Sequence, residues 1–446
     1  MGILALLVFI SVTVVMNVPL RRPISEALLV ALLATALVGG DPLHLLGVGI
    51  WGALDNDVTF AGMAFVFMGV IVAASGLIER LIEVFNSVFG RLRGGAAYVS
   101  TAGSAAIGLV AGSTAGNAAT VGSVTIPWMK KDGWSSARAA TLVAGNSGLG
   151  VSLPPNSTMF IILATPAAVG ISAGDVYVSL LVAGSYCVLY RMLVVFYWTR
   201  RDGIQRTDSG HVQSFGRALA TGWRSLTIFV GILIPVVLTF GPLFDWLASE
   251  SRVGAESMDT ISIIVWVPIL ISAIALVEGR KRLRGRWGSV RRAIRAEAPQ
   301  FATVGISLFA ALAASEIMSE LGVGPQLSAA LAGMSLPAPL LILVICVVAV
   351  VVATPLSSTA TAAAIGAPAV IAMGSVDVPT VTAVCAVLVC TSTEGASPPV
   401  GAPIYLASGM AEVSPKRTFI PLIVWFVVPV IAIAWLIGMG WLPIPG

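Results

Sequence analysis

Long apolar stretches recur from one end of the chain to the other, separated by short polar clusters. Most come close to the roughly 20 residues that a helix needs to cross the hydrocarbon core of a membrane. Two blocks, at residues 95–175 and 321–410, are equally apolar but are interrupted by polar and proline-rich steps. The pattern predicts spanning helices over residues 2–18, 24–40, 58–78, 176–198, 226–247, 260–277, 299–320 and 418–441.

The composition indicates a membrane protein and argues against a soluble enzyme. Of 446 residues, 57% are hydrophobic and 10% are charged, and the mean hydropathy is +0.97. A soluble domain is far more polar. The sequence contains no His-Glu-x-x-His segment, P-loop or nucleophile elbow, so we expect no enzyme activity. Its four cysteines lie inside apolar runs and are expected to be buried small hydrophobes.

The basic residues are distributed as a topology signal. If the loop at Arg21 and Arg22 faces the cytoplasm, the later lysine and arginine clusters also fall inside. Of 25 basic residues only Arg252 then remains outside, and both termini are periplasmic or extracellular. Arg191 lies inside a helix and is expected to snorkel to the inner surface. For the arginine-rich residues 280–286, an inner-surface anchor is favoured over nucleic-acid or anionic-lipid binding.

The two interrupted blocks carry the same signals at one fixed offset. A small polar cluster begins at Ser113 and again at Ser357, and a Pro-Pro step begins at Pro154 and again at Pro398. Both features therefore recur after 244 residues with no gap between them. This agreement predicts an internal repeat.

The charge count gives the two copies opposite orientations. The first block turns at residues 130–132, which carry two lysines and fall inside, whereas the second turns at residues 375–377, which carry no basic residue. Inverted repeats with interrupted helices are typical of secondary transporters, in which the breaks mark the binding site. The sequence predicts an all-α polytopic membrane protein with an inverted repeat, two re-entrant helical hairpins and two broken helices.

The tips and breaks offer oxygen atoms and helix starts. Each hairpin is expected to have a polar tip, at residues 113–117 or 357–361, and each following helix to break at residues 150–155 or 394–399. Successive prolines leave several backbone carbonyls unpaired, and these suit a desolvated sodium ion. Helix starts after the tips suit an anionic substrate. Hydroxyls that could complete the ion shell belong to Ser113, Thr114, Ser358, Thr391, Thr393 and Ser397, although packing of small residues is an alternative role for each.

Glu394 is the one acid placed at a break. Burial of its charge without a partner would cost roughly 3 kcal/mol. Three roles remain open for it: a proton-coupling carboxyl, a cation ligand, or a partner for a neighbouring hydroxyl.

At these residues the chain resembles the large membrane subunit of the tripartite ATP-independent periplasmic (TRAP) transporters. The matching stretches are GST at 112–114, GSVTIPWMKK at 122–131, GVSLPPNS at 150–157, SPPVG at 397–401 and ASG at 407–409. The resemblance implies an elevator carrier for sodium-driven uptake of an organic acid, with a small four-helix membrane subunit and a soluble periplasmic binding protein. The family's cation ligands would correspond to Ser113, Thr114, Gly150, Leu153, Pro155, Ser358, Glu394, Ser397 and Val400.

Two positions depart from the family pattern. Family members often carry Asp-Gly-Thr at the second tip, where this chain has Ser357, Ser358 and Thr359, and a glycine is usual where Glu394 stands. One acid is lost and another gained nearby, which leaves the number and identity of the coupling ions open.

We therefore expect a sodium-coupled symporter subunit of the bacterial inner membrane that imports a small carboxylate or similar anion, with sodium as the only metal, no cofactor and no nucleic-acid partner. The alternative is a stand-alone cation-coupled anion carrier that needs no binding protein. A channel or a membrane-embedded enzyme is a more distant possibility. Substrate-side candidates are Asn117, Asn156, Ser157, Thr359 and Thr361.

The expected domain division follows the two interrupted blocks. Residues 1–94 form the scaffold of the first repeat, and residues 95–175 form the first transport hairpin and broken helix. Residues 176–320 are scaffold helices with basic cytoplasmic loops. Residues 321–410 form the second transport hairpin and broken helix, and residues 411–446 form a closing helix.

Overall fold

The computed structural model describes residues 1–17, 19–55, 57–205, 215–239, 246–247, 249, 262–284, 287–323, 326, 336–354, 356–399 and 401–445. Within these ranges the chain forms helices and no strand. The expected all-helical fold is confirmed.

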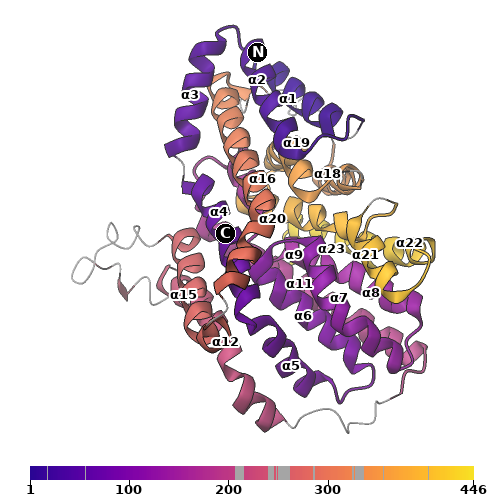
Figure 1. Cartoon of the computed structure of the whole chain (residues 1–446). Helices are drawn as coiled ribbons and strands as arrows, with labels where there is room; N and C mark the ends of the chain where they lie inside the picture. Colours follow the sequence, from indigo (N-terminus) through magenta and orange to yellow (C-terminus); the bar gives the residue numbers. More distant parts are fainter. Residues whose placement is uncertain are drawn as a thin grey trace.

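One group of helices surrounds the long helix α16. In this group α16 packs against α2, α3 and α4, α15 packs between α4 and α12, and α1 packs against α2. Most of these helices occupy the upper end and the left side of the view in Figure 1, and α5 lies in its lower middle part. Their bounds are α1 (Gly2–Asn17), α2 (Ile24–Val38), α3 (Pro42–Asp55), α4 (Asp57–Ser75), α5 (Leu77–Phe89), α12 (Phe215–Thr239), α15 (Ile263–Leu283) and α16 (Trp287–Glu320).

A second group contains both interrupted blocks. From the first block come α6 (Gly95–Ala111), α7 (Thr114–Lys131), α8 (Ser136–Ser147), α9 (Leu149–Ser152), α10 (Ser157–Leu163) and the short η1 (Pro166–Ala168). From the second come α18 (Ala338–Ala353), α19 (Ser358–Gly374), α20 (Thr380–Thr391), η3 (Ser392–Ala396) and α21 (Ala402–Ala411). The group is completed by α11 (Ala173–Arg201) and by the C-terminal helix α22 (Lys416–Leu422), η4 (Ile423–Val427) and α23 (Val428–Gly438).

The two blocks are interwoven. The helix α21 of the second block packs on α7 and α8 of the first, and α10 of the first block packs on α19 of the second. Helix bounds also repeat at the 244-residue offset: α8 spans Ser136–Ser147 and α20 spans Thr380–Thr391, while α7 begins at Thr114 and α19 at Ser358. Each broken helix therefore packs against helices of the other block.

Five described helices are long and apolar enough to cross a membrane, and the bent pair α3 and α4, which meet at 47°, would make six. The sequence did not predict α3 or α5. A glycine in the left-handed conformation, Gly76, ends α4 before α5 begins. The helix α5 is amphipathic, with Glu79, Arg80 and Glu83 on its polar side, so hydropathy alone does not detect it.

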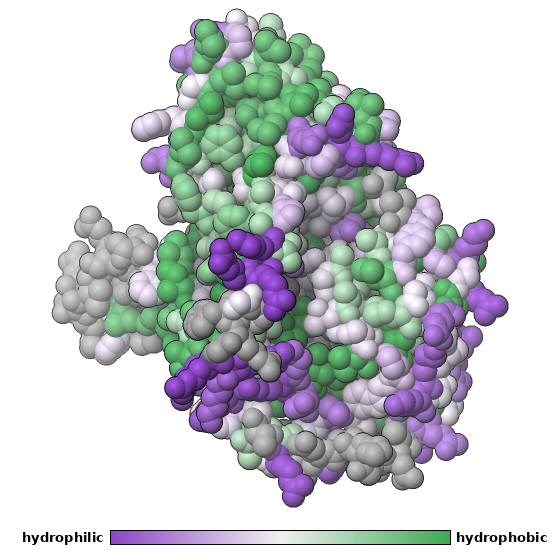
Figure 2. Space-filling view, viewed as in Figure 1, coloured by the Kyte–Doolittle hydropathy of each residue, from purple (hydrophilic) through white to green (hydrophobic). Residues whose placement is uncertain are grey.

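Apolar side chains face outward on several of these helices. Exposed examples include Leu33, Leu189 and Val351, each more than half exposed. Figure 2 shows hydrophobic residues over much of the face around α2, α3 and α16, and hydrophilic residues gathered toward the lower part of the view. Such surfaces suit a lipid environment. All four cysteines are buried, as expected.

A close helix contact provides the first test. A Cβ atom on Gly145 of α8 would lie 2.3 Å from the buried ring of Phe426. We expect Gly145→Ala to destabilise the protein by about 1–3 kcal/mol, because overpacking a buried site forces neighbours to move. The matched control is Gly409→Ala, where nothing lies within 4 Å of the added atom. Thermal unfolding of the purified chain in detergent should show a lower midpoint for Gly145→Ala only, and equal midpoints would contradict this packing.

Candidate functional site

Each hairpin turns at a serine that caps the following helix. At the start of the first tip, Gly112 is left-handed and the Ser113 hydroxyl accepts a hydrogen bond from the Gly116 N–H at 3.2 Å. At the start of the second tip, the Ser357 hydroxyl accepts from the Ala360 N–H at 3.2 Å. The two tips therefore begin α7 and α19 with the same N-cap chemistry.

The first break (residues 153–156) is held by one asparagine. The Asn156 amide nitrogen donates to the carbonyl oxygens of Val151 at 2.8 Å and Leu153 at 3.0 Å. Its amide oxygen accepts from the Met159 N–H at 2.8 Å and caps α10. With 2% of its surface exposed, Asn156 satisfies both ends of the break.

The second break (residues 397–401, described except for residue 400) uses hydroxyls in place of an amide. The buried Ser397 hydroxyl donates to the Thr393 carbonyl at 2.8 Å, and the Thr393 hydroxyl donates to the Cys390 carbonyl at 2.7 Å. The Thr391 hydroxyl likewise donates to the Leu388 carbonyl. These hydroxyls bond to their own helix turn. The Pro154-Pro155 and Pro398-Pro399 peptide bonds are both cis.

The first tip rests directly on the first break. A Cβ atom on Gly150 would lie 2.7 Å from the Ser113 carbonyl oxygen, so only a glycine lets these backbones approach this closely. A Cβ atom on Gly112 would lie 3.0 Å from the Pro155 carbonyl oxygen. Of the expected cation ligands, Ser113, Gly150 and Pro155 are thus brought together.

Glu394 lies between the two tips. The Thr114 hydroxyl donates to Glu394 Oε2 at 3.1 Å, and the N–H and hydroxyl of Ser358 face the same carboxyl. Thr114 and Ser358 are the first helical residues of α7 and α19. One partly buried carboxyl therefore joins the starts of two helices that are far apart in sequence.

The broken helices meet where α8 and α20 end. A Cβ atom on Gly148 would lie 2.4 Å from the Ser392 carbonyl oxygen and 3.1 Å from Arg191 Nη2. Arg191 is only 2% exposed, so its expected snorkelling to the inner surface is wrong. The helix α11, which lies outside the two interrupted blocks, brings this cation to the broken helices.

The substrate-side candidates lie at varied depth. The amide nitrogen of buried Asn117 donates to the Ser104 carbonyl at 2.8 Å, which ties α7 to α6. The hydroxyl of buried Thr361 donates to the Ser357 carbonyl. Thr359 and Ser157 are partly exposed, and Thr359 lies within 3.0 Å of the Ser357 hydroxyl. Among the expected cation ligands, Val400 lies outside the described residues.

A cavity of about 490 Å³ opens beside the first tip. Ser113, Gly116 and Thr120 line one side of it, and residues of α4 line the other, with Glu297 of α16 at its edge. Apart from Ser113, these lining residues were not expected from the sequence, because apolar helix faces carry no signal of a cavity.

The described residues form an all-helical fold with several helices apolar and long enough to cross a membrane. The structure is similar to the crystal structure of the YdaH transporter of Alcanivorax borkumensis, with a TM-score of 0.63 and 18% sequence identity, covering 90% of this chain and 89% of that chain. The sequence matches the family described as tripartite ATP-independent periplasmic transporter, DctM component, over residues 3–443, and the chain belongs to this family. It is a family of transporter permeases rather than enzymes, and membership implies a multi-pass protein of the bacterial inner membrane.

Three curated relatives show how far the similarity reaches. The uncharacterized protein y4mL of Sinorhizobium fredii is 27% identical over 54% of this chain and 55% of that protein. The C4-dicarboxylate TRAP transporter large permease DctM of Pseudomonas aeruginosa is 25% identical over 47% of each. The isethionate TRAP transporter permease DctMQ of Oleidesulfovibrio alaskensis is 28% identical over 41% of this chain and 28% of that protein. The chain thus aligns with about half of these relatives' length or less.

The asparagine of the first break can be tested by stability. We expect Asn156→Ala to cost about 2–4 kcal/mol, because it removes one helix cap and leaves two buried carbonyls unpaired. Asn156→Asp keeps the cap but turns an oxygen toward both carbonyls, so it should also destabilise strongly. Ser157→Ala, next in sequence and partly exposed, is the control. Unfolding midpoints in detergent that match for all three variants would show that Asn156 does not hold the break.

Proposed function

We propose that this chain is a sodium-coupled secondary transporter subunit that imports a small organic anion by an elevator mechanism. The observation that carries the proposal is the Glu394 carboxyl held between the starts of α7 and α19, beside both breaks. Family membership supports the transporter class.

Oxygen atoms around the tips support a cation site. Near the first tip, the Ser113 carbonyl lies close to Gly150 and the Pro155 carbonyl lies close to Gly112. The Leu153 carbonyl already accepts a bond from Asn156. Near the second tip lie Ser358 and Glu394, with Ser397 in the adjoining break. We propose that sodium takes oxygen ligands here, and that Glu394 is one of them, because a cation would compensate its buried charge.

Helix starts support an anionic substrate. The N-termini of α7 and α19 converge on one region through Thr114 and Ser358, and such ends favour negative charge. The names of two relatives cite a C4-dicarboxylate and isethionate, which supports a small carboxylate or sulfonate as the substrate class. We retain Asn117, Asn156, Ser157, Thr359 and Thr361 as candidates, of which the partly exposed Ser157 and Thr359 are best placed for direct contact.

We propose that the two interrupted blocks form an inverted repeat with re-entrant hairpins, and that they move together against the group around α16. The repeated helix bounds of α8 and α20 support the repeat. The helix α11 packs along α6, α9 and α20. We therefore propose that it moves with the two blocks, although the sequence assigned it to the scaffold helices of residues 176–320. A small membrane subunit and a periplasmic binding protein complete the proposed assembly. Both termini are proposed to face the periplasm.

Sodium dependence is the decisive test of transport. In proteoliposomes that contain the whole assembly, uptake of radiolabelled succinate or isethionate should need an inward sodium gradient. One net positive charge moving inward across 100 mV contributes about 2.3 kcal/mol. An inside-negative potential should therefore increase uptake if the sodium ions outnumber the negative charges of the anion, which takes two or more ions for isethionate and three or more for succinate. Uptake that stays undiminished when choline replaces sodium would refute the coupling.

The role of Glu394 can be separated from transport. We expect sodium to raise the thermal unfolding midpoint of the purified chain relative to choline, because a ligand that binds the folded state stabilises it. If the carboxylate binds the ion, Glu394→Gln should need about tenfold more sodium to reach the same rise in the unfolding midpoint. Glu297→Gln, which removes an acid beside the neighbouring cavity, is the matched control. If both variants keep the wild-type response, Glu394 is only a partner for the tip hydroxyls.

A further inference from the structure

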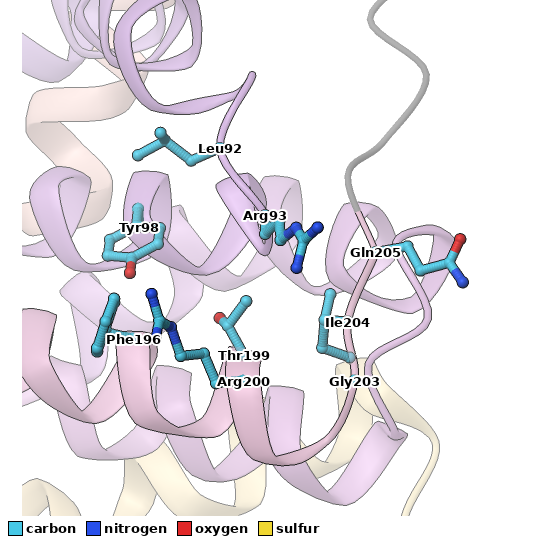
Figure 3. A pocket seen from close by; sticks show the side chains of 9 residues that line it. All are labelled: Leu92, Arg93, Tyr98, Phe196, Thr199, Arg200, Gly203, Ile204 and Gln205. Carbon is cyan, nitrogen blue, oxygen red and sulfur yellow. The ribbon is translucent and has the colours of Figure 1, made fainter.

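A second cavity, of about 1160 Å³, lies at the C-terminal end of α11. Figure 3 shows its lining: Tyr98 from α6 faces Arg200 from α11, and Arg93 reaches in from the turn before α6. Thr199 and Phe196 complete the α11 side. The cavity lies at the N-terminal end of α6, whereas the first tip follows its C-terminal end. It shares no lining residue with the cavity at the first tip.

The two guanidinium groups of this cavity have no carboxylate partner in the described part of the chain. Neither Arg93 nor Arg200 forms an ion pair there. By contrast, the nearby Arg138 pairs with Asp202 at 3.1 Å. Arg200 lies over the Phe196 ring at 4.3 Å and interacts with Tyr98. Two cations that pair with no carboxylate of the described residues therefore line one cavity.

The surroundings of the cavity match a membrane interface. Phe196 and Leu92 line the cavity and are each 46% exposed. Phe196 lies in the last turns of the apolar helix α11, and Leu92 lies in the turn before α6. Aromatic and basic side chains gather at such interfaces. Arginine forks bind phosphate oxygens in pairs, so the cavity offers phosphate recognition beside an apolar wall.

The tyrosine of this cavity has no polar counterpart in the second block. At the 244-residue offset, Ile342 of α18 stands for Tyr98 of α6 and lines a cavity of about 370 Å³.

We infer that the cavity between α6 and α11 is a binding site for a phosphate-bearing anion, held by Arg93 and Arg200 with the Tyr98 hydroxyl as a further donor. The phosphate belongs either to the headgroup of an anionic phospholipid or to free inorganic phosphate. The site is separate from the proposed sodium and substrate site and does not depend on it.

Two binding measurements on the full-length purified chain test this site. Native mass spectrometry compares dioleoylphosphatidylglycerol with dioleoylphosphatidylcholine, and thermal unfolding compares inorganic phosphate with chloride at equal ionic strength. The test variant is Arg93→Gln/Arg200→Gln. The matched control is Arg91→Gln/Arg201→Gln, which removes the same charge from neighbouring positions that do not line the cavity. If the glutamine pair does not fold, Arg93→Lys/Arg200→Lys replaces it.

We expect the test pair to lose about tenfold in affinity for one of the two probes while the control pair changes less than about twofold. The lysine pair should lose about threefold, because lysine cannot bind phosphate oxygens as a fork. A selective loss of phosphatidylglycerol binding assigns the site to lipid, and a selective loss of the phosphate effect assigns it to free phosphate. Equal behaviour of test and control pairs with both probes would overturn the inference.

Discussion

Backbone groups at the two breaks must find partners inside the protein, and the rest of the arrangement depends on how they do so. Unpaired peptide groups cost several kcal/mol away from water. In the first break one asparagine bonds two carbonyls and one N–H. In the second, hydroxyls bond back to their own turn. The same problem is thus solved with different side chains, and in both cases the break is fixed by local bonds that leave the adjoining tips free to contact it.

The two blocks differ in the residue through which each break contacts the tips. Gly150 and Glu394 occupy equivalent positions at the 244-residue offset. Gly150 lets the Ser113 backbone approach directly, whereas Glu394 extends a carboxyl to Thr114 and Ser358. The same position of the repeat thus gives a close backbone contact in one block and a carboxyl that joins two helix starts in the other.

The sequence predicted the parts of the fold that hydropathy and proline control. The bounds of α1, α2 and α11, the two serine caps and both breaks lie close to the predicted positions. Hydropathy detected only the apolar part of α12 and α16, since both helices begin with a charged or polar turn outside the predicted span. The bond between Thr114 and Glu394 joins residues 280 apart. No local pattern encodes such a contact, and the same is true of the cavities.

Arg191 shows how a residue outside the breaks can determine their geometry. Its guanidinium is buried, and Nε and Nη1 find no hydrogen-bond partner among the described residues. Yet Nη2 lies beside Gly148, at the C-terminal end of α8, where the Ser392 carbonyl also approaches at the end of α20. Helix C-termini carry partial negative charge and favour a cation. The end of α8 beside Arg191 therefore offsets part of the desolvation cost of this cation, and α11 also packs on α9 and α20.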